Sequence, residues 1–491
     1  MSNPQPAKSG KPGSLVSAIS WNTLSTVGAY VMQFGRSVFV ARILAPDAFG
    51  LFGMALTVLQ AASVLTEFGL SSWIIANQGD HDETLTLDTM WSLEILRRAI
   101  VSVLLVAAAY PATLYFGDHR LLGITLALGL APLLQGFQNV GLILYQRRMQ
   151  FRPVAMHRLL TEILSCTATV LVAWLYPTVW ALVASMLAGN LISVAMSFTI
   201  SPYRPRWRID GATFRKSLNF GKHIFTVGLL TYVTTQFDNL VVGRYLGTET
   251  LAFYMLAYRL ANLPVDIFGS ILSTALFPAY SQLNSMQPDQ LREEFVRISG
   301  LSSLFLVVII APFLFLSEPM IAIVYSPKWL AAAPMLGLLA WQGLARGLSR
   351  VMSPLLLGIQ RPDLDAKAKI IEAAVFVPLT IVLVQRWGAT GAAWAGVVSY
   401  ALAYLLRLGA VCLVWKDHRI WLIRKLTAPL LRALTVYAAC QVLLGRGANA
   451  WAVTAAYMIA VTAGAWFLDP EQRAAGVALW RRLLRSFAGI S

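Results

Sequence analysis

The chain has 491 residues, of which 57% are hydrophobic and 13% are charged, and its formal net charge is +16. A soluble core of this size could not hide so much apolar surface, so the composition excludes an ordinary globular enzyme and requires a membrane. The positive charge alone would also fit a nucleic-acid-binding protein.

Apolar stretches of about twenty residues recur along the whole chain, and each is long enough to cross about 30 Å of hydrocarbon as a helix. They predict an all-α polytopic membrane protein with about fourteen transmembrane helices. In chain order, the predicted spans are 16–42, 47–76, 88–115, 121–146, 154–176, 178–200, 220–243, 248–280, 298–317, 330–358, 368–386, 390–415, 426–445 and 450–468. The first stretch is too long for a cleaved signal peptide, so we expect it in the mature protein.

The 39 Lys and Arg residues divide unevenly between the two sides of the membrane that these spans imply. Twenty-five fall on the side of the N-terminus, six fall on the other side, and eight lie inside spans. This asymmetry predicts that both termini are cytoplasmic, and it accounts for most of the net charge without nucleic acid. The basic tail around Arg481, Arg482 and Arg485 fits either an amphipathic helix on the anionic leaflet or a solvated segment.

A weak internal repeat divides the chain. The segment from Arg42 to Phe52 aligns with the segment from Arg244 to Tyr254 at a constant offset of 202 residues. Six predicted spans separate the copies, and an even number restores the orientation, so the repeat is parallel. We therefore expect two six-helix lobes around a central cavity, residues 1–200 and 201–416, joined by the linker 201–210. Residues 417–491 would add two helices and the basic tail.

Eight arginines fall inside predicted spans, where each costs about 2.5–3.5 kcal/mol against lipid. They are Arg36, Arg97, Arg98, Arg259, Arg346, Arg350, Arg407 and Arg432. Arg97 and Arg98 follow Glu94 at helical ion-pair spacing. Arg407 and Arg432 lie near span ends, where we expect them to snorkel. For these four arginines the sequence favours a structural role.

The other four arginines belong to polar stripes that each follow one helical face. The stripes are Asn22, Thr26, Gln33 and Arg36; Thr231, Thr235 and Asp238; Arg259, Asn262 and Asp266; and Gln342, Arg346, Ser349 and Ser353. Such stripes fit either polar contacts between helices or an aqueous cavity. A cationic cavity predicts an anionic cargo, and guanidinium groups suit phosphate. The candidate substrate-binding residues are Arg36, Arg259, Arg346, Arg350, Gln33 and Asn262.

Three carboxylates are candidates for gating or ion coupling. Asp238 lies 202 residues after Arg36, so the repeat predicts that the two side chains either pair or gate, unless Asp238 bonds only within its own lobe. Glu67 and Asp266 each precede a Phe-Gly pair and would bind a proton or sodium ion, or serve as structural acceptors. We expect no cofactor beyond a coupling ion or the membrane potential. The Asp363-x-Asp365 pair resembles a glycosyltransferase metal motif, but its place after Pro362 favours a helix start.

Two segments resemble the polysaccharide transporter family of the multidrug/oligosaccharidyl-lipid/polysaccharide (MOP) flippase superfamily, which holds O-antigen, exopolysaccharide and colanic-acid-type flippases. They run from Arg36 to Phe52 and from Phe237 to Pro264. Both are similar to peptidoglycan lipid flippases, in which the arginines matching Arg36 and Arg259 face the central cavity.

The resemblance implies a flippase in the bacterial inner membrane. It would carry undecaprenyl-diphosphate-linked oligosaccharide from the cytoplasmic to the periplasmic leaflet by alternating access, for surface polysaccharide or lipopolysaccharide biosynthesis. Expected partners are this lipid, membrane lipids, and a polysaccharide polymerase or export protein, but no nucleic acid.

Three alternatives remain at this stage. A multidrug antiporter of the same superfamily should have an acidic or aromatic cavity, which the arginines oppose. A membrane-embedded polysaccharide polymerase or ligase generally needs a large periplasmic loop, and no connection exceeds about twenty residues. A scaffold without transport activity would leave the polar stripes unexplained.

Overall fold

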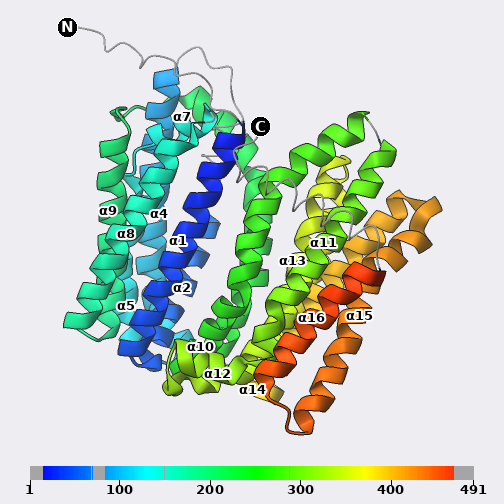
Figure 1. Ribbon diagram of the computed structural model, residues 1–491. Helices are drawn as coiled ribbons and strands as arrows, with labels where there is room; N and C mark the ends of the chain where they lie inside the picture. The colour runs from blue at the N-terminus through cyan, green and yellow to red at the C-terminus, as the bar shows by residue number, and fades with distance from the viewer. Residues whose placement is uncertain (1–14, 68, 70–82, 149, 287, 469–491) are drawn as a thin grey trace. The chain divides into compact units, whose positions relative to one another are not determined.

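The computed structural model describes residues 15–67, 69, 83–148, 150–286 and 288–468, and within them every regular element is a helix. The chain divides into two compact units, Met1–Tyr232 and Val233–Ser491 (Figure 1). The boundary between the units falls inside the long helix α10, so each unit is described by itself.

The N-terminal unit is built from helices that lie side by side (Figure 1). In it α1 packs on α8, α8 on α9, and α4 on α2, α5 and α6. Its helices are α1 (Leu15–Ile43), α2 (Pro46–Leu65), α4 (Glu83–Phe116), α5 (Arg120–Leu128), α6 (Leu130–Gly136), α7 (Gly141–Arg147), α8 (Phe151–Leu175), α9 (Val179–Ile200) and the start of α10 at Gly211.

Two predicted spans of this unit were wrong in extent or shape. The span predicted over 47–76 ends as helix α2 at Leu65, because Thr66 leaves the helical conformation and caps the helix with its hydroxyl on the Ser63 carbonyl, at 3.1 Å. Residues 70–82 lie outside the described part. The span predicted over 121–146 is broken, and the segment Arg120–Gly136 is bent by 59° from Gly141–Arg147.

Asn139 explains the break between α6 and α7. Its side-chain oxygen accepts the Gly141 N–H at 2.8 Å, and its side-chain amide donates to the Tyr203 carbonyl at 2.7 Å. An ideal Cβ on Gly141 would lie 2.3 Å from the Ser201 hydroxyl, so only glycine lets the chain pass this close to the segment after α9.

The C-terminal unit is also built from helices. It contains the rest of α10 (to Met286), α11 (Pro288–Phe315), α12 (Ser317–Val324), the 3-10 turn η1 (Pro327–Ala332), α13 (Ala333–Gly358), α14 (Pro362–Val414), η2 (Lys416–His418), α15 (Arg419–Gly445) and α16 (Ala450–Leu468). Glycines in the left-handed region interrupt its two longest helices, Gly247 at φ 81° in α10 and Gly388 at φ 62° in α14.

These breaks separate the predicted spans. Gly247 divides the spans predicted over 220–243 and 248–280, and Gly388 divides those over 368–386 and 390–415. Ala45, the extended residue between α1 and α2, precedes Gly247 by the offset of 202 residues that the sequence repeat gives. The two units therefore interrupt their helices at equivalent positions.

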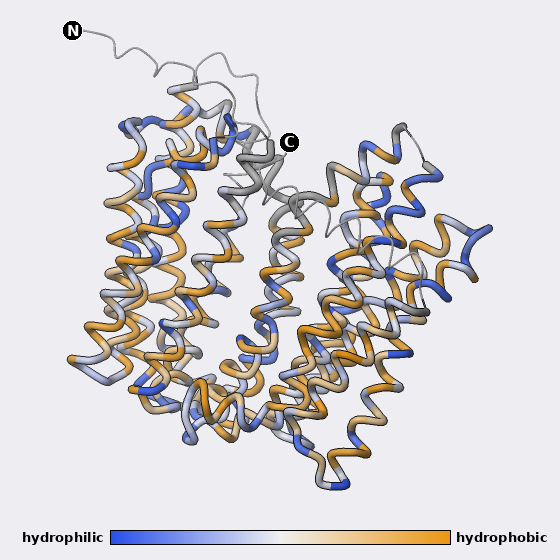
Figure 2. Tube along the Cα trace, in the orientation of Figure 1, coloured by the Kyte–Doolittle hydropathy of each residue, from blue (hydrophilic) through white to orange (hydrophobic). Residues whose placement is uncertain are grey.

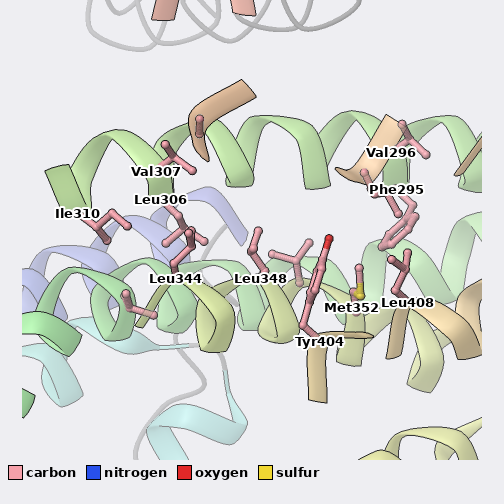
Figure 3. Close-up of a cluster of buried hydrophobic side chains, with 14 of the residues drawn as sticks. Phe295, Val296, Leu306, Val307, Ile310, Leu344, Leu348, Met352, Tyr404 and Leu408 are labelled. Atoms are coloured by element: carbon pink, nitrogen blue, oxygen red, sulfur yellow. The ribbon is translucent and has the colours of Figure 1, made fainter. Parts of the chain in front are cut away.

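A large apolar cluster holds the C-terminal unit together where α11, α13 and α14 meet. Figure 3 shows Leu306 and Ile310 of α11 facing Leu344 and Leu348 of α13, with Tyr404 of α14 beside them. Lipid tails are as apolar as these side chains, so the cluster joins the helices through close packing. The packed cluster gives α13 a fixed position from which to present its polar residues.

The chain is an all-helical, multi-span membrane protein. In the described part, seven helices are long and apolar enough to cross a membrane, or eight if the bent pair around Asn139 counts as one span. Among the seven, α14 alone covers two predicted spans. Figure 2 shows apolar residues along the helices of both units and hydrophilic residues at several of their turns.

Candidate functional site

In the N-terminal unit, the polar stripe on α1 meets a carboxylate on α8. Gln33 donates its amide to Glu162 Oε2 at 3.2 Å, and the Arg36 guanidinium lies 3.5 Å from Glu162 Oε1. The Arg36 side chain is 28% exposed and the Glu162 side chain 15%. At 3.5 Å this is an ion pair but not a hydrogen bond, since Glu162 Oε1 has no hydrogen-bond donor in the described residues.

The remainder of the α1 stripe also contacts α8. Arg158 donates to the Thr26 hydroxyl at 2.8 Å, so two successive polar levels join the helices. The side chain of Asn22, predicted on the same stripe, lies outside the described residues. Sequence analysis missed Glu162, although a lone carboxylate in the middle of the span predicted over 154–176 was a usable signal.

Glu67 belongs to a compact ionic cluster with α4. Arg97, with a side chain 7% exposed, donates to Glu67 Oε2 at 3.1 Å and to Glu94 through two nitrogens at 2.8 and 2.5 Å. Arg98 donates to Glu94 at 2.8 Å. The predicted pairing of both arginines with Glu94 is confirmed. Glu67 also accepts the Gly69 N–H at 3.2 Å, so it joins the end of α2 to α4.

In the C-terminal unit, the stripes of α10 and α13 form one polar ladder. Tyr258, Asn262 and Asp266 are four residues apart on α10, and all three bind Arg346 of α13. Arg346 donates to the Tyr258 hydroxyl at 3.0 Å, to Asn262 Oδ1 at 2.9 Å and to Asp266 Oδ1 at 2.5 Å. Asn262 in turn donates to the Tyr258 carbonyl at 3.0 Å. Arg346 therefore serves as a structural link between the helices.

Arg350 completes the ladder at its more exposed end. Its guanidinium lies 3.0 Å from Asp266 Oδ1, so both arginines share one carboxylate oxygen. The Arg350 side chain is 39% exposed, against 12% for Arg346. Gly269 leaves room for this arginine, because an ideal Cβ there would lie 2.6 Å from Arg350 Nη1.

Asp238 lies apart from these ion pairs in α10. It is 1% exposed, accepts the Tyr254 hydroxyl at 2.7 Å and accepts the backbone N–H of Asn239 at 2.9 Å. These donors are neutral and belong to the same unit, and Asp238 forms no ion pair with a described residue. The predicted gating contact of Asp238 with Arg36 stays a prediction.

Arg259 is exposed on α10, one residue after the ladder member Tyr258. Successive residues of an α-helix point about 100° apart, so Arg259 extends from a different face than Tyr258. Its predicted role in binding substrate stays a prediction.

The predicted snorkelling of Arg407 was wrong. Instead of snorkelling, its side chain is 7% exposed and binds Asp365 at 2.7 Å and Glu372 at 3.6 Å, all on α14. The Ser353 hydroxyl of α13 donates to the same Asp365 at 2.9 Å. A charge this deep requires partners, which the two carboxylates supply.

The carboxylates of the Asp-x-Asp motif have different partners, because Asp363 pairs with Arg361 whereas Asp365 pairs with Arg407.

The α13 stripe also contains polar groups without partners. Gln342 is fully buried, and neither its side-chain oxygen nor its nitrogen has a hydrogen-bond partner in the described residues; the same holds for the Ser349 hydroxyl. Gln342 fills the space beside Gly396 of α14, where an ideal Cβ would lie 2.7 Å from its amide. The predicted stripe of Gln342, Arg346, Ser349 and Ser353 is thus buried against other helices over most of its length.

In each unit, the candidate residues that the structure describes form ion pairs and hydrogen bonds. Guanidinium, carboxylate, amide and phenol groups within helical spans can bind and release a polar ligand, which is the chemistry of a membrane transporter. Within the described part, no three His, Cys, Asp or Glu side chains gather as metal ligands would.

The chain belongs to a family described as polysaccharide biosynthesis proteins, whose model matches residues 39–334, more than half of the chain. Among curated relatives, the succinoglycan biosynthesis transport protein ExoT of Rhizobium meliloti (strain 1021) is 28% identical over 66% of this chain and 65% of its own length. The lipopolysaccharide biosynthesis protein WzxC of Escherichia coli (strain K12) is 25% identical over 77% of this chain and 76% of its own.

Solved structures show the same fold at low identity. A lipid II flippase MurJ, in an inward closed conformation, superposes with a TM-score of 0.70 at 15% identity over 95% of this chain and all of its own. An inward-facing multidrug resistance MATE family transporter of the MOP superfamily gives 0.61 at 15% identity over 79% of this chain and 96% of its own.

Proposed function

We propose that this protein is a flippase that moves undecaprenyl-diphosphate-linked oligosaccharide from the cytoplasmic to the periplasmic leaflet by alternating access. Membership of the polysaccharide biosynthesis family supports the proposal, as do relatives named for succinoglycan and lipopolysaccharide biosynthesis. The multi-span helical fold supplies the membrane setting in which a lipid-linked cargo resides.

The observation that carries the proposal is the number of unused guanidinium donors inside helical spans. A guanidinium offers five N–H donors. Arg36 makes one ion pair at 3.5 Å and Arg350 one at 3.0 Å among the described residues, and both side chains are partly exposed. Donors therefore remain on each arginine for the oxygens of a phosphate, which guanidinium binds two at a time. Arg346, in contrast, already donates three hydrogen bonds to other residues of the protein.

The oligosaccharide would be bound by amides and aromatic rings, while the lipid tail stays in the bilayer. The proposed location is the bacterial inner membrane with both termini cytoplasmic, supported by the 25-to-6 division of basic residues. We propose residues 1–200 and 201–416 as the moving lobes, with 417–491 as an appendage. A polysaccharide polymerase or export protein is the proposed protein partner.

Transport of a bulky anion requires a driving force, for which we propose a proton, a sodium ion or the membrane potential. Of the three candidate carboxylates, Glu67 and Asp266 each bind an arginine, whereas Asp238 accepts only from neutral donors. Asp238 is therefore the carboxylate that can change its charge without leaving an arginine unpaired. An Asp238→Asn variant should flip substrate in vesicles independently of a pH gradient; an unchanged gradient response would exclude Asp238.

The site is tested by export of surface glycan in a deletion strain complemented with variants. Alanine at Arg36 or Arg259 should abolish export at normal membrane expression. Lysine should restore it partially, since it keeps the charge and loses the bidentate fork. Arg432→Ala is the matched control, because it removes an arginine from α15 and should leave export intact. Normal export by the Arg36→Ala/Arg259→Ala double variant would refute this site.

A further inference from the structure

The linker 201–210 after α9 is an extended segment fixed along the first turns of α4. Its backbone N–H groups at every second residue donate to α4 side chains: Arg206 to Asp88 Oδ1 at 2.8 Å, Arg208 to Ser92 Oγ at 3.1 Å and Asp210 to Thr89 Oγ1 at 3.1 Å. This alternation is that of an extended strand. The three acceptors are 0–4% exposed, so the bonds are shielded from water.

Tyr203 fastens the beginning of the linker. Its hydroxyl donates to the Asp88 carboxylate, and its ring packs on the apolar cluster that includes Leu87 and Met90. Its carbonyl accepts the Asn139 amide. Burial raises the pKa of the Tyr203 phenol, and the neighbouring Asp88 raises it further, so the hydroxyl stays a donor. The linker is thus held at both ends and along its length.

The hydrogen bonds that fix the linker do not explain why residues 206 and 208 are arginines. The donors at Arg206 and Arg208 are backbone groups, which any residue except proline could supply. Their guanidinium groups are exposed and have no hydrogen bond or ion pair with a described residue. Between them Trp207 is 60% exposed, and the next residue, Ile209, is 51% exposed. Successive side chains of an extended segment point to opposite faces, so the fixed backbone displays the two cations on one face and the indole on the other.

The linker lies at the arginine-rich end of the N-terminal unit. Helix α9 ends just before it, α4 begins beside it, and α7 ends at Arg147, close in sequence to Arg148 and to Arg152 in α8. An indole flanked by basic residues is suited to the boundary between lipid headgroups and acyl chains. Because the backbone is already fixed, binding would not have to order it.

We propose that Arg206 and Arg208 form a binding surface for anionic phospholipid headgroups of the cytoplasmic leaflet, with Trp207 on the opposite face of the same segment as an interfacial anchor. The two guanidinium groups bind the headgroup phosphate, and the indole lies at the level of the glycerol backbone. This proposal rests on the sidedness of the proposed function, and on neither its cargo nor its transport cycle. The surface would fix the level of the N-terminal unit in the membrane.

The test measures lipid binding without transport. Purified protein in detergent is titrated with phosphatidylglycerol or phosphatidylcholine, and bound lipid is resolved by native mass spectrometry. The wild type should retain phosphatidylglycerol preferentially, and less of it as salt is raised. Each arginine removed should weaken binding about five-fold, so R206Q/R208Q should lose about 25-fold at low salt. R206K/R208K, which keeps both charges, should retain most of the binding.

The matched control is R419Q/R424Q, which removes two exposed cations from α15 on the same proposed side. Equal loss in this control, or equal retention of the two lipids by the wild type, would overturn the proposal. A double Gln variant that fails to fold leaves the lipid preference and salt response of the wild type to decide. Loss of flipping with intact lipid preference would contradict the proposed function and leave this surface standing.

Discussion

Arg346 and Arg350 bind the same carboxylate oxygen of Asp266, yet they differ in exposure and in the number of their contacts. Arg346 is 12% exposed and makes three hydrogen bonds to α10, whereas Arg350 is 39% exposed and makes one ion pair. Replacing Arg346 by alanine breaks a buried pair and leaves two polar partners unpaired, which costs about 3–5 kcal/mol. Replacing Arg350 removes a partly exposed pair, which costs about 0–1 kcal/mol.

We therefore expect Arg346→Ala to lower the melting temperature of the purified protein strongly. Arg350→Ala should leave it almost unchanged and abolish glycan export. Gly269→Ala provides a third variant, because its Cβ would displace the Arg350 guanidinium without removing it. It should reduce export with little change in stability, since the end of a flexible side chain can move. Thermal unfolding in detergent and export in a complemented deletion strain are the two measurements.

Equal destabilisation by Arg350→Ala and Arg346→Ala would contradict a role of Arg350 in binding cargo. Export that only follows the expression level of each variant would contradict that role as well. Either result would mean that the ladder is one structural unit and that Arg350 does not contact cargo.

Two further predictions concern topology and gating. Cysteines introduced after Asp118, Gly247 and Arg446 should react with impermeant reagents from the periplasmic side. Labelling of these cysteines from the cytoplasm alone would contradict the predicted topology. Cysteines at Arg36 and Asp238 should crosslink in the closed resting state and be protected by lipid-linked substrate. Absence of that crosslink in every condition, while control pairs on the same helices do join, would exclude the gating pair.

The fold was largely predictable because each span is long, apolar and bounded by polar turns. Both glycine breaks, Gly247 and Gly388, fell between predicted spans. The failures were local. A 3.6-residue period does not reveal where one polar side chain ends a helix, as Thr66 does, or where an amide bridges a break, as Asn139 does.

The site was predictable one helix at a time. Spacing of four residues placed Asn262 and Asp266 on one face of α10, and Arg346 and Arg350 on one face of α13. The sequence could not show that these faces meet, because helical period says nothing about which helix is the neighbour. Glu162 was missed because the candidate carboxylates were chosen from the repeat, the polar stripes and the Phe-Gly pairs, and Glu162 belongs to none of these.

Arg407 shows how distance from a span end misleads. A side chain snorkels when its charged group has a lower free energy in water than beside a partner inside the protein. Here Asp365 is 42 residues away along α14 and binds Arg407 at 2.7 Å, which makes the interior the better environment. The sequence does not reveal this partner, because Asp365 and Arg407 lie on the two parts of α14 that Gly388 separates.

The carboxylates beside the candidate arginines also bear on which anions the protein accepts. Glu162 beside Arg36 and Asp266 beside Arg350 lower the cost of cationic groups when no cargo is bound. An anion must then compete with one carboxylate at each arginine.

A phospholipid phosphate with a single charge gains little over that carboxylate, whereas a diphosphate carries more charge and offers oxygens to more donors. Undecaprenyl diphosphate should therefore bind at least ten-fold more tightly than phosphatidylglycerol, a phosphodiester with a single charge, and this ratio corresponds to about 1.4 kcal/mol. Glu162→Gln and Asp266→Asn should narrow this ratio, because an amide competes less with a single charge. Equal affinities for the two lipids in the wild type, measured by displacement of a fluorescent analogue, would show that these carboxylates do not select the cargo.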